Sequence, residues 1–441
     1  MSIYDYESSF ESADTTTKAM RNAVEDWFSL YYQLSATEAS DPCQRIAYTV
    51  VNKIVKTVFG EYKVSAISPV VAALIARLDK KRKEALQLAL VGGECYIKPC
   101  PAEGGFSFTL IPRNNVLIFG RDAEGAPVDM GTVEKTVRGK YYYTLLERRS
   151  VDEKGYLTIE NRLFRSTASD KLGNQVSLSE HPEYGALAVR YRYPEPVGSV
   201  GLARIKTPML NCVDGSADGV AVFAPAAGLI RNIDRNEAQL NGEFSRGESR
   251  IIASSDLLGR NSQGSRDLTD HLFVGLDEDP EQVGITVFSP ELREKSFLAR
   301  KHEYLRNVES IIGLRRGMLS DANIEERTAT EIASSAGDYN LTVMDFQEMW
   351  ENALRQVVDI CCVLARLYRL DVPKDLTFSV DWGNGILYDE GATWEAYKQM
   401  VTSGLLKPEV ALGWRFNMPA ETEADLAAIR KRYMPEQTQI N

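Results

Sequence analysis

The chain has 441 residues, of which 44% are hydrophobic and 26% are charged, and its formal net charge is −11. This composition is ordinary for a globular protein and excludes the intrinsically disordered class, and the length predicts about two to four domains. The negative charge argues against an ordinary nucleic-acid binder, which would carry a basic face. It is compatible with a surface past which DNA slides without sticking.

The sequence predicts neither a membrane protein nor a secreted one. No apolar run approaches the roughly 18–20 residues that span a bilayer. The N-terminal stretch MSIYDYESSFESADTTTK is acidic and polar, unlike a signal peptide. The six cysteines have neither disulfide nor zinc spacing, which agrees with synthesis in the cytosol.

The first half of the chain changes from a helical to a strand period. Apolar residues three and four apart predict helices over 16–33, 40–60 and 69–90. Gly92 and Gly93 are expected to cap the third helix. From 93 to about 193 the period is two, which predicts an antiparallel β region of about six strands.

The second half is predicted to be mostly helical. A loop rich in Gly, Pro, Asp and Ser is expected over 194–218. The elements expected after it are helices at 220–245 and 290–312, strands at 249–254 and 285–290 around a polar excursion, a long helix from 328, a strand and turn from 378, and short helices at 390–403, 407–415 and 421–433. The long helix keeps apolar spacings of 3, 4 and 7 over some forty residues, which makes a rod of about 60 Å.

Catalytic patterns are missing from the sequence. Three histidines, His181, His271 and His302, fall on distinct predicted elements, and no metal cluster or nucleophile–His–Asp set can be assembled from the spacing. Cys361 and Cys362 lie within the long helix and are expected to be core residues. We therefore expect no enzyme activity, no metal and no cofactor.

The order of elements resembles that of the portal proteins of tailed double-stranded DNA bacteriophages, in particular siphovirus-type head-to-tail connectors. Three segments carry the resemblance: TPMLNCVDGSADGVAVFAPAAGLIRNIDRNEAQLNGEFSRGESRI (207–251), HEYLRNVESIIGLRRGMLSDANIEERTATEIAS (302–334), and FSVDWGNGILYDE followed by VTSGLLKPEVAL (378–412). The resemblance implies an α+β portal fold with a helical and β wing, a two-helix stem, a small α/β clip, a long tunnel-side helix and a short helical crown.

Carried onto this sequence, the family's parts have definite boundaries. They are the wing at 1–217, the first stem helix at 218–248, the clip at 249–289, the second stem helix at 290–312, the tunnel loop at 313–327, the long wing helix at 328–369 and the crown at 370–441.

The resemblance also implies partners and a location. The chain would form a homododecameric ring at one capsid vertex of the virion, after assembly in the host cytoplasm. Double-stranded DNA would pass through the ring during packaging and ejection, without sequence specificity. The terminase large subunit, the head–tail adaptor, and the major capsid and scaffold proteins would bind the ring.

Two sets of residues follow from this assignment. The first is the DNA-channel loop, with Arg315, Arg316, Gly317, Met318, Leu319, Ser320 and Asn323. Its arginines suit weak phosphate contact, although salt bridges between subunits would explain them as well. The second is the start and hinge of the long helix, with Thr328, Thr330 and Glu331 as cap residues and Gly337 as the expected bend.

Two other functions remain compatible with the residues alone. A non-viral oligomeric scaffold or adaptor protein could also use a long helical rod. A metabolic enzyme with an unrecognised site is the third alternative, which the distribution of histidines disfavours.

Overall fold

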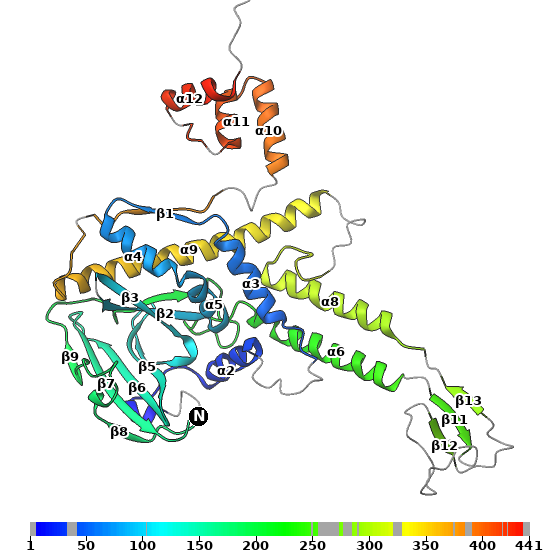
Figure 1. Ribbon diagram of the computed structural model, residues 1–441, viewed down its shortest axis with the longest axis horizontal. Helices are drawn as coiled ribbons and strands as arrows, with labels where there is room; N and C mark the ends of the chain where they lie inside the picture. Colours follow the sequence, from blue (N-terminus) through cyan, green and yellow to red (C-terminus); the bar gives the residue numbers. More distant parts are fainter. Residues whose placement is uncertain are drawn as a thin grey trace, which may run out of the picture. The chain divides into compact units, whose positions relative to one another are not determined.

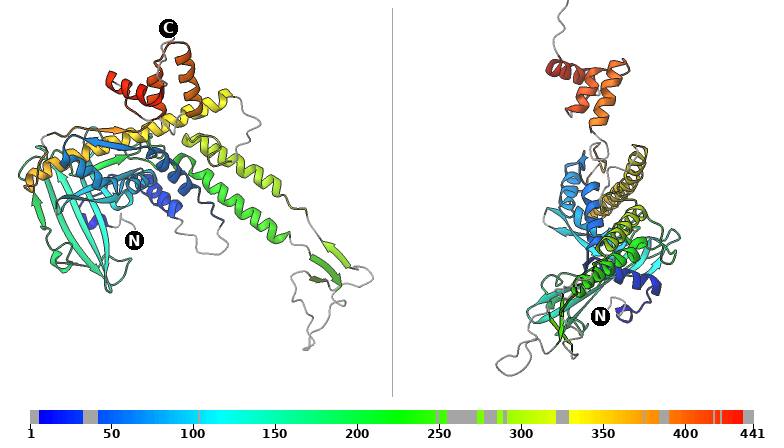
Figure 2. Two further views of the ribbon diagram at one scale, coloured as in Figure 1. Left: turned by 45° about the horizontal axis from the view of Figure 1, so that its top comes forward. Right: turned by 90° about the vertical axis from the view of Figure 1, so that its right-hand side faces the viewer.

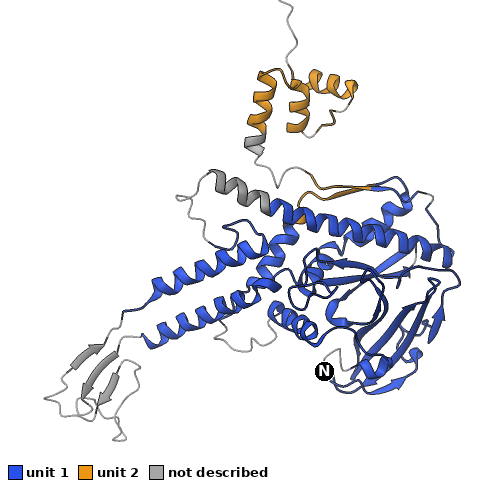
Figure 3. Cartoon of the chain, turned by 180° about the vertical axis from the view of Figure 1, so that it is seen from behind, with its two compact units in different colours: residues 1–56, 66–378 blue, residues 57–65, 379–441 orange. Residues whose placement is uncertain are grey.

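A computed structural model of the chain describes residues 6–32, 42–102, 104–247, 250–254, 273–276, 285–288, 291–320, 329–373, 375–383, 390–416, 418–420 and 422–434. The chain divides into two compact units (Figure 3). The first comprises residues 1–56 and 66–378, and the second residues 57–65 and 379–441.

The N-terminal region is helical, as predicted, but one expected helix is two. Its helices are α1 (Glu7–Phe10), α2 (Lys18–Tyr32), α3 (Ile46–Val58), α4 (Pro69–Asp79) and α5 (Arg82–Gly92). The prediction of a single helix over 69–90 is wrong, because the backbone leaves helical geometry at Lys81 (φ −109°, ψ 1°). Lys80 and Lys81 lie in a run of charged residues and are exposed, so nothing apolar holds the two helices in one register. Gly93 ends α5 with φ 80°, which confirms the expected glycine cap.

The predicted β region forms two sheets. The larger has the order β4-β5-β6-β7-β8, with β9 also paired to β7, and the smaller has the order β10-β2-β3. The strands are β2 (Glu94–Ala102), β3 (Gly105–Pro112), β4 (Val116–Arg121), β5 (Pro127–Arg138), β6 (Tyr141–Val151), β7 (Leu157–Ser166), β8 (Asn174–Val176), β9 (Arg190–Arg192) and β10 (Ala203–Lys206), with short 3₁₀ turns at Arg113–Asn115 and Leu178–Glu180. Every pairing in these two sheets is antiparallel, as predicted.

Three of these strands, β5, β8 and β10, were not among the six expected. β5 is central to the larger sheet, yet its sequence PVDMGTVEKTVR is rich in residues that strands disfavour. β10 lies inside the stretch predicted to be a loop, so that prediction is wrong for 203–206. Ala203 pairs there with Ile97 and Lys206 with Glu94. The four residues of β10 are a strand because they pair with β2, which lies about a hundred residues earlier in the sequence.

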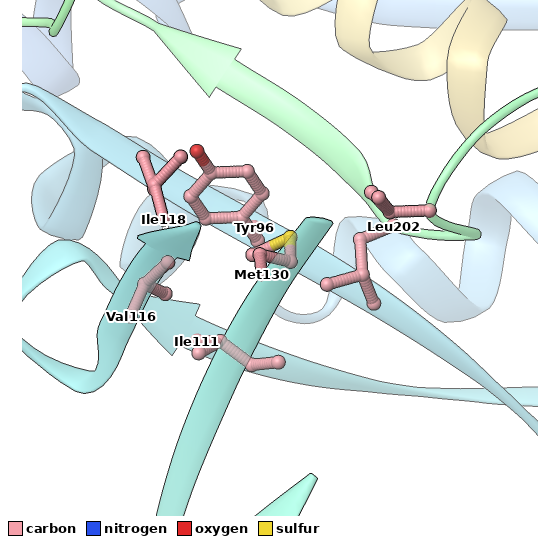
Figure 4. Packing of buried hydrophobic residues seen from close by; sticks show 7 residues of the cluster. Tyr96, Ile111, Val116, Ile118, Met130 and Leu202 are labelled. Atoms are coloured by element: carbon pink, nitrogen blue, oxygen red, sulfur yellow. The ribbon is translucent and has the colours of Figure 1, made fainter. Parts of the chain in front are cut away.

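The core between the two sheets is continuous and apolar. Figure 4 shows Tyr96 and Ile111 of the smaller sheet gathered with Val116, Ile118 and Met130 of the larger one, and Leu202 joins them just before β10. Because side chains alternate along each strand, residues from both sheets meet on one side only. The sheets therefore form one packed body.

Two antiparallel helices leave this body side by side (Figures 1 and 2). They are α6 (Ala227–Arg246), which follows a 3₁₀ turn at Ala224–Ala226, and α8 (Glu294–Ile312). Both predicted helices are confirmed, and both begin later than expected. Before α6 the chain forms a 3₁₀ turn that contains Pro225. Between them, β11 (Arg250–Ser254), β12 (Phe273–Leu276) and β13 (Ile285–Phe288) form a sheet of order β12-β11-β13, in which β11 and β12 are parallel.

The long helix is confirmed as α9 (Ala329–Leu367), a single element of 39 residues. It packs along β10 of the smaller sheet and against α4. Trp350 and Val357 on this packed face are fully buried. Gln356 Oε1 accepts a hydrogen bond from the main-chain N–H of Arg204 in β10 (2.9 Å).

The second unit carries the three predicted short helices. They are α10 (Glu390–Thr402), α11 (Pro408–Arg415) and α12 (Glu423–Tyr433), and a two-stranded sheet joins β1 (Lys63–Ala66) to β14 (Phe378–Asp381). Thr422 and Asp425 form a reciprocal capping box at the start of α12. None of the helices described in the two units is both long and apolar enough to cross a membrane.

Candidate functional site

The loop after α8 begins with a glycine-dependent helix end. Gly313 has φ 75° and its N–H donates to the carbonyl of Ser310, while the N–H of Leu314 donates to the carbonyl of Glu309 (2.8 Å). This pair of bonds is a Schellman motif, and the side chain of Leu314 is buried, as is common in that motif. A Cβ on Gly313 would also lie 2.5 Å from Thr342 Oγ1 of α9. The end of α8 is therefore fixed before the loop proper begins.

Arg315 and Arg316 occupy the first two positions of a tight turn. The N–H of Met318 donates to the carbonyl of Arg315 (3.1 Å), and Gly317 at the third position has φ 90°. Positive φ at the third position of a β-turn favours glycine, which explains that residue. Both arginine side chains are exposed. The turn thus places two neighbouring arginine side chains at the surface of the subunit.

The rest of the loop folds around one carboxylate. Glu309 is 1% exposed, and it accepts hydrogen bonds from the N–H groups of Gly317 (3.1 Å) and Leu319. It also accepts from both the N–H (2.8 Å) and the hydroxyl (2.9 Å) of Ser320. The loop from 313 to 320 is therefore a compact unit centred on a residue of α8.

The structure brings most of the predicted loop residues together. Residues 315–318 form the turn, and Leu319 and Ser320 bring the chain back to Glu309 of α8. Gly317, Met318 and Leu319 are partly exposed. Ser320 is buried, so its hydroxyl faces Glu309 rather than solvent. Asn323 and Thr328 lie outside the described residues. Thr330, Glu331 and Gly337 lie within α9, and their roles as cap and bend stay predictions.

Sequence reasoning missed Glu309, although a signal was present. Leu305, Val308 and Ile312 form the buried stripe of α8, and Glu309 falls on that same stripe. A carboxylate at an apolar position of an amphipathic helix requires a polar partner, because burial without hydrogen bonds is costly. The partners come from the loop that follows.

A second buried carboxylate lies at the entry to α6. Glu94, the first residue of β2, is fully buried and accepts hydrogen bonds from Tyr96 Oη (2.7 Å) and the N–H of Gly219 (2.8 Å). It also forms an ion pair with Arg204 of β10. Burial would raise the pKa of Glu94, but the guanidinium groups of Arg204 and Arg113 outweigh it and lower the pKa to about 2.

Arg113 extends this network toward the N-terminus. It is fully buried and pairs with Asp218 (3.1 Å), which Arg121 also contacts (2.6 Å). The Nη2 atom that contacts Asp218 also donates to Thr16 Oγ1 (2.9 Å). The network therefore joins the N-terminal segment, both sheets and the segment that leads into α6.

The chain passes very close to itself beside this network. A Cβ on Gly93 would lie 2.3 Å from the carbonyl carbon and oxygen of Gly219, and Gly93 has φ 80°. The N–H of Thr207 donates to the Gly93 carbonyl (3.0 Å), and that of Val222 to the Leu90 carbonyl (2.8 Å). The segment before α6 is thus held against α5 and β2 by backbone hydrogen bonds, and the close approach of Gly93 and Gly219 leaves no room for a Cβ at either residue.

The described histidines and cysteines form no catalytic set. His181 is buried between the rings of Tyr143 and Tyr184. Cys361 is buried in α9, and burial raises its thiol pKa, with a smaller contribution from Cys362. In the described ranges, no group of three or more His, Cys, Asp and Glu side chains could hold a metal ion. His271 lies outside those ranges.

Comparison of the sequence with models of known protein families supports the resemblance to phage portal proteins. The family model described as "Phage portal protein, SPP1 Gp6-like" matches residues 74–434 of the chain. The chain belongs to this family. No protein with curated annotation matches it.

As a phage portal protein, the chain belongs to the ring through which DNA enters and leaves the capsid. Portal proteins are structural components and not enzymes, which agrees with the expectation from the sequence. The family confirms the predicted resemblance over most of the chain, together with an oligomeric ring and passage of DNA. The structure agrees with the predicted α+β class, since helices and strands are both present and both sheets of the region 94–206 are antiparallel.

Proposed function

We propose that twelve copies of this portal protein form the ring at one capsid vertex, and that the loop 313–327 lines its DNA channel. The single observation that carries the proposal is the turn at Arg315 and Arg316. It places two exposed arginine side chains on a loop fixed to the end of α8. Guanidinium groups bind phosphate without reading sequence, as a translocation path requires.

The other parts of the ring are proposed with the boundaries given by the resemblance. The wing is 1–217, the stem helices are 218–248 and 290–312, the clip is 249–289, the long wing helix is 328–369 and the crown is 370–441. The terminase large subunit and the head–tail adaptor would bind the clip. The major capsid and scaffold proteins would bind the wing.

The stem helices support assembly into a ring. The buried residues of α8 are Leu305, Val308, Glu309 and Ile312, all in its second half. In its first half Leu298 is 37% exposed, and Phe244 near the end of α6 is 44% exposed. Two helices that pack mainly against each other leave apolar surface that neighbouring copies would cover.

The test removes the two channel arginines. We expect R315A/R316A to form rings of unchanged mass, because neither side chain is buried, and to reduce the amount of DNA packaged per particle. R190A/R192A is the matched control, since it removes two exposed arginines of β9 (side chains 73% and 58% exposed). Ring mass is measured by native mass spectrometry and packaged DNA by nuclease protection. Packaging equal to wild type in R315A/R316A would show that the loop does not contact DNA.

A further inference from the structure

We propose that Glu309 is the positioning residue of the channel loop, and that it fixes the arginine turn to the last turn of α8. The proposal deepens the proposed function and rests on it only in taking the loop to border the channel. The inferred contact itself is between residues of one subunit.

Every acceptor position of the Glu309 carboxylate is used by the loop. Oε1 accepts from the N–H groups of Leu319 and Ser320, and Oε2 accepts from the N–H of Gly317 and the hydroxyl of Ser320. A carboxylate offers about four acceptor sites, so its capacity matches these four donors. The three N–H groups come from within four consecutive residues, which curls the chain around the charge as in an anion-binding nest.

The charge of Glu309 is stabilised by the loop itself. Across the described residues no lysine or arginine forms an ion pair with this carboxylate, whereas Arg300 and Lys301 of the same helix pair with Glu303 and Glu237. At 1% exposure water cannot replace the loop donors. The buried charge therefore strongly favours the closed loop, because an open loop would leave it without partners.

Glu309 holds the turn from both sides. Its main-chain carbonyl accepts the N–H of Leu314, which precedes the arginines, and its side chain accepts the N–H of Gly317, which follows them. Arg315 and Arg316 thus lie between two anchors on one residue. A rotation or shift of α8 would carry the arginines with it.

The experiment compares loop opening in assembled rings of three variants. E309Q replaces one oxygen by an NH₂ group, which cannot accept and faces N–H donors, so we expect amide hydrogen exchange across 314–320 to accelerate by about tenfold or more. Trypsin cleavage after Arg315 and Arg316 should accelerate in parallel. S320A retains the carboxylate and removes one donor, so a smaller acceleration is expected. E303Q, an exposed residue of the same helix (side chain 58% exposed), should match wild type.

Unchanged exchange over 314–320 in E309Q would overturn the proposal. If E309Q does not assemble, S320A decides, and unchanged exchange in S320A rings would then overturn it. These outcomes are separate from the packaging test. Faster exchange in E309Q together with normal packaging in R315A/R316A would retain Glu309 as the anchor and reject the loop as a DNA contact.

Discussion

Glu94 and Glu309 are both buried carboxylates that accept an N–H from a glycine, but they connect very different parts of the chain. The donors to Glu94 from Arg204 and Gly219 are 110 and 125 residues away in sequence. Those to Glu309 are 8 to 11 residues away. Breaking a long-range network affects folding of the whole unit, whereas breaking a local one opens a single segment. The first glutamate supports the fold and the second orders a loop.

The largest effect is expected for E94Q. Removing the charge takes from Arg204 its ion-pair partner in the core, which costs about 3–5 kcal/mol in free energy of unfolding. Denaturant-induced unfolding would measure it. E160Q is the control, because Glu160 pairs with the exposed Arg190 and should change stability by less than about 1 kcal/mol. Equal losses in the two variants would contradict the distinction drawn between core and surface pairs.

Stability should also fall in acid because of two buried glutamates. Burial would raise the pKa of Glu147, but Arg149 and Lys98 outweigh it and lower the pKa from 4.5 to about 2, as happens for Glu94. A lowered pKa contributes stability that is present above pH 4.5 and is lost as the pH falls toward 2. The contribution is on the order of 3 kcal/mol for each group.

Melting temperatures measured between pH 6 and 3 would test this expectation. The E147Q variant should be less stable than wild type at pH 6, and its melting temperature should fall less steeply with acid. Parallel curves for wild type and E147Q would show that Glu147 does not contribute to the acid dependence.

The smallest effect is expected for G313A at the start of the loop. A left-handed backbone costs alanine about 1–2 kcal/mol, and the new methyl group would approach Thr342. Exchange of the amides at 313–320 should accelerate while the remainder of the unit stays unchanged. G313N is the matched variant, since asparagine adopts this conformation more readily, and its exchange should lie closer to wild type. Global destabilisation by G313A would contradict the local character of the loop.

The long periodic elements could be predicted from sequence, and the short ones could not. The apolar spacing of α9 persists over many turns, so its extent was predictable to within a few residues. β10 has four residues and becomes a strand only because β2 lies beside it. The break at Lys81 was not predictable either, because lysine has a good helix propensity and the backbone leaves helical geometry at exposed residues.

The candidate site was predictable only in part. Arg315 and Arg316 were visible as exposed charges between glycines, and the glycine at 313 as a helix end. Three of the four donors to Glu309 are main-chain N–H groups, which every residue except proline carries, so no side-chain pattern encodes them. Only the unusual position of a carboxylate among Leu305, Val308 and Ile312 indicated that something polar had to meet it.

The uninterrupted length of α9 gives the long helix leverage. At 1.5 Å per residue its 39 residues span about 58 Å, and its buried face from Tyr339 to Ala365 lies against the sheet and α4. A rigid tilt of the whole helix by about 5° displaces one end relative to the other by about 5 Å, close to the pitch of one helical turn. A small reorientation of the sheet that carries α9 would therefore become a displacement of about one helical turn at the end of the helix that begins with Ala329.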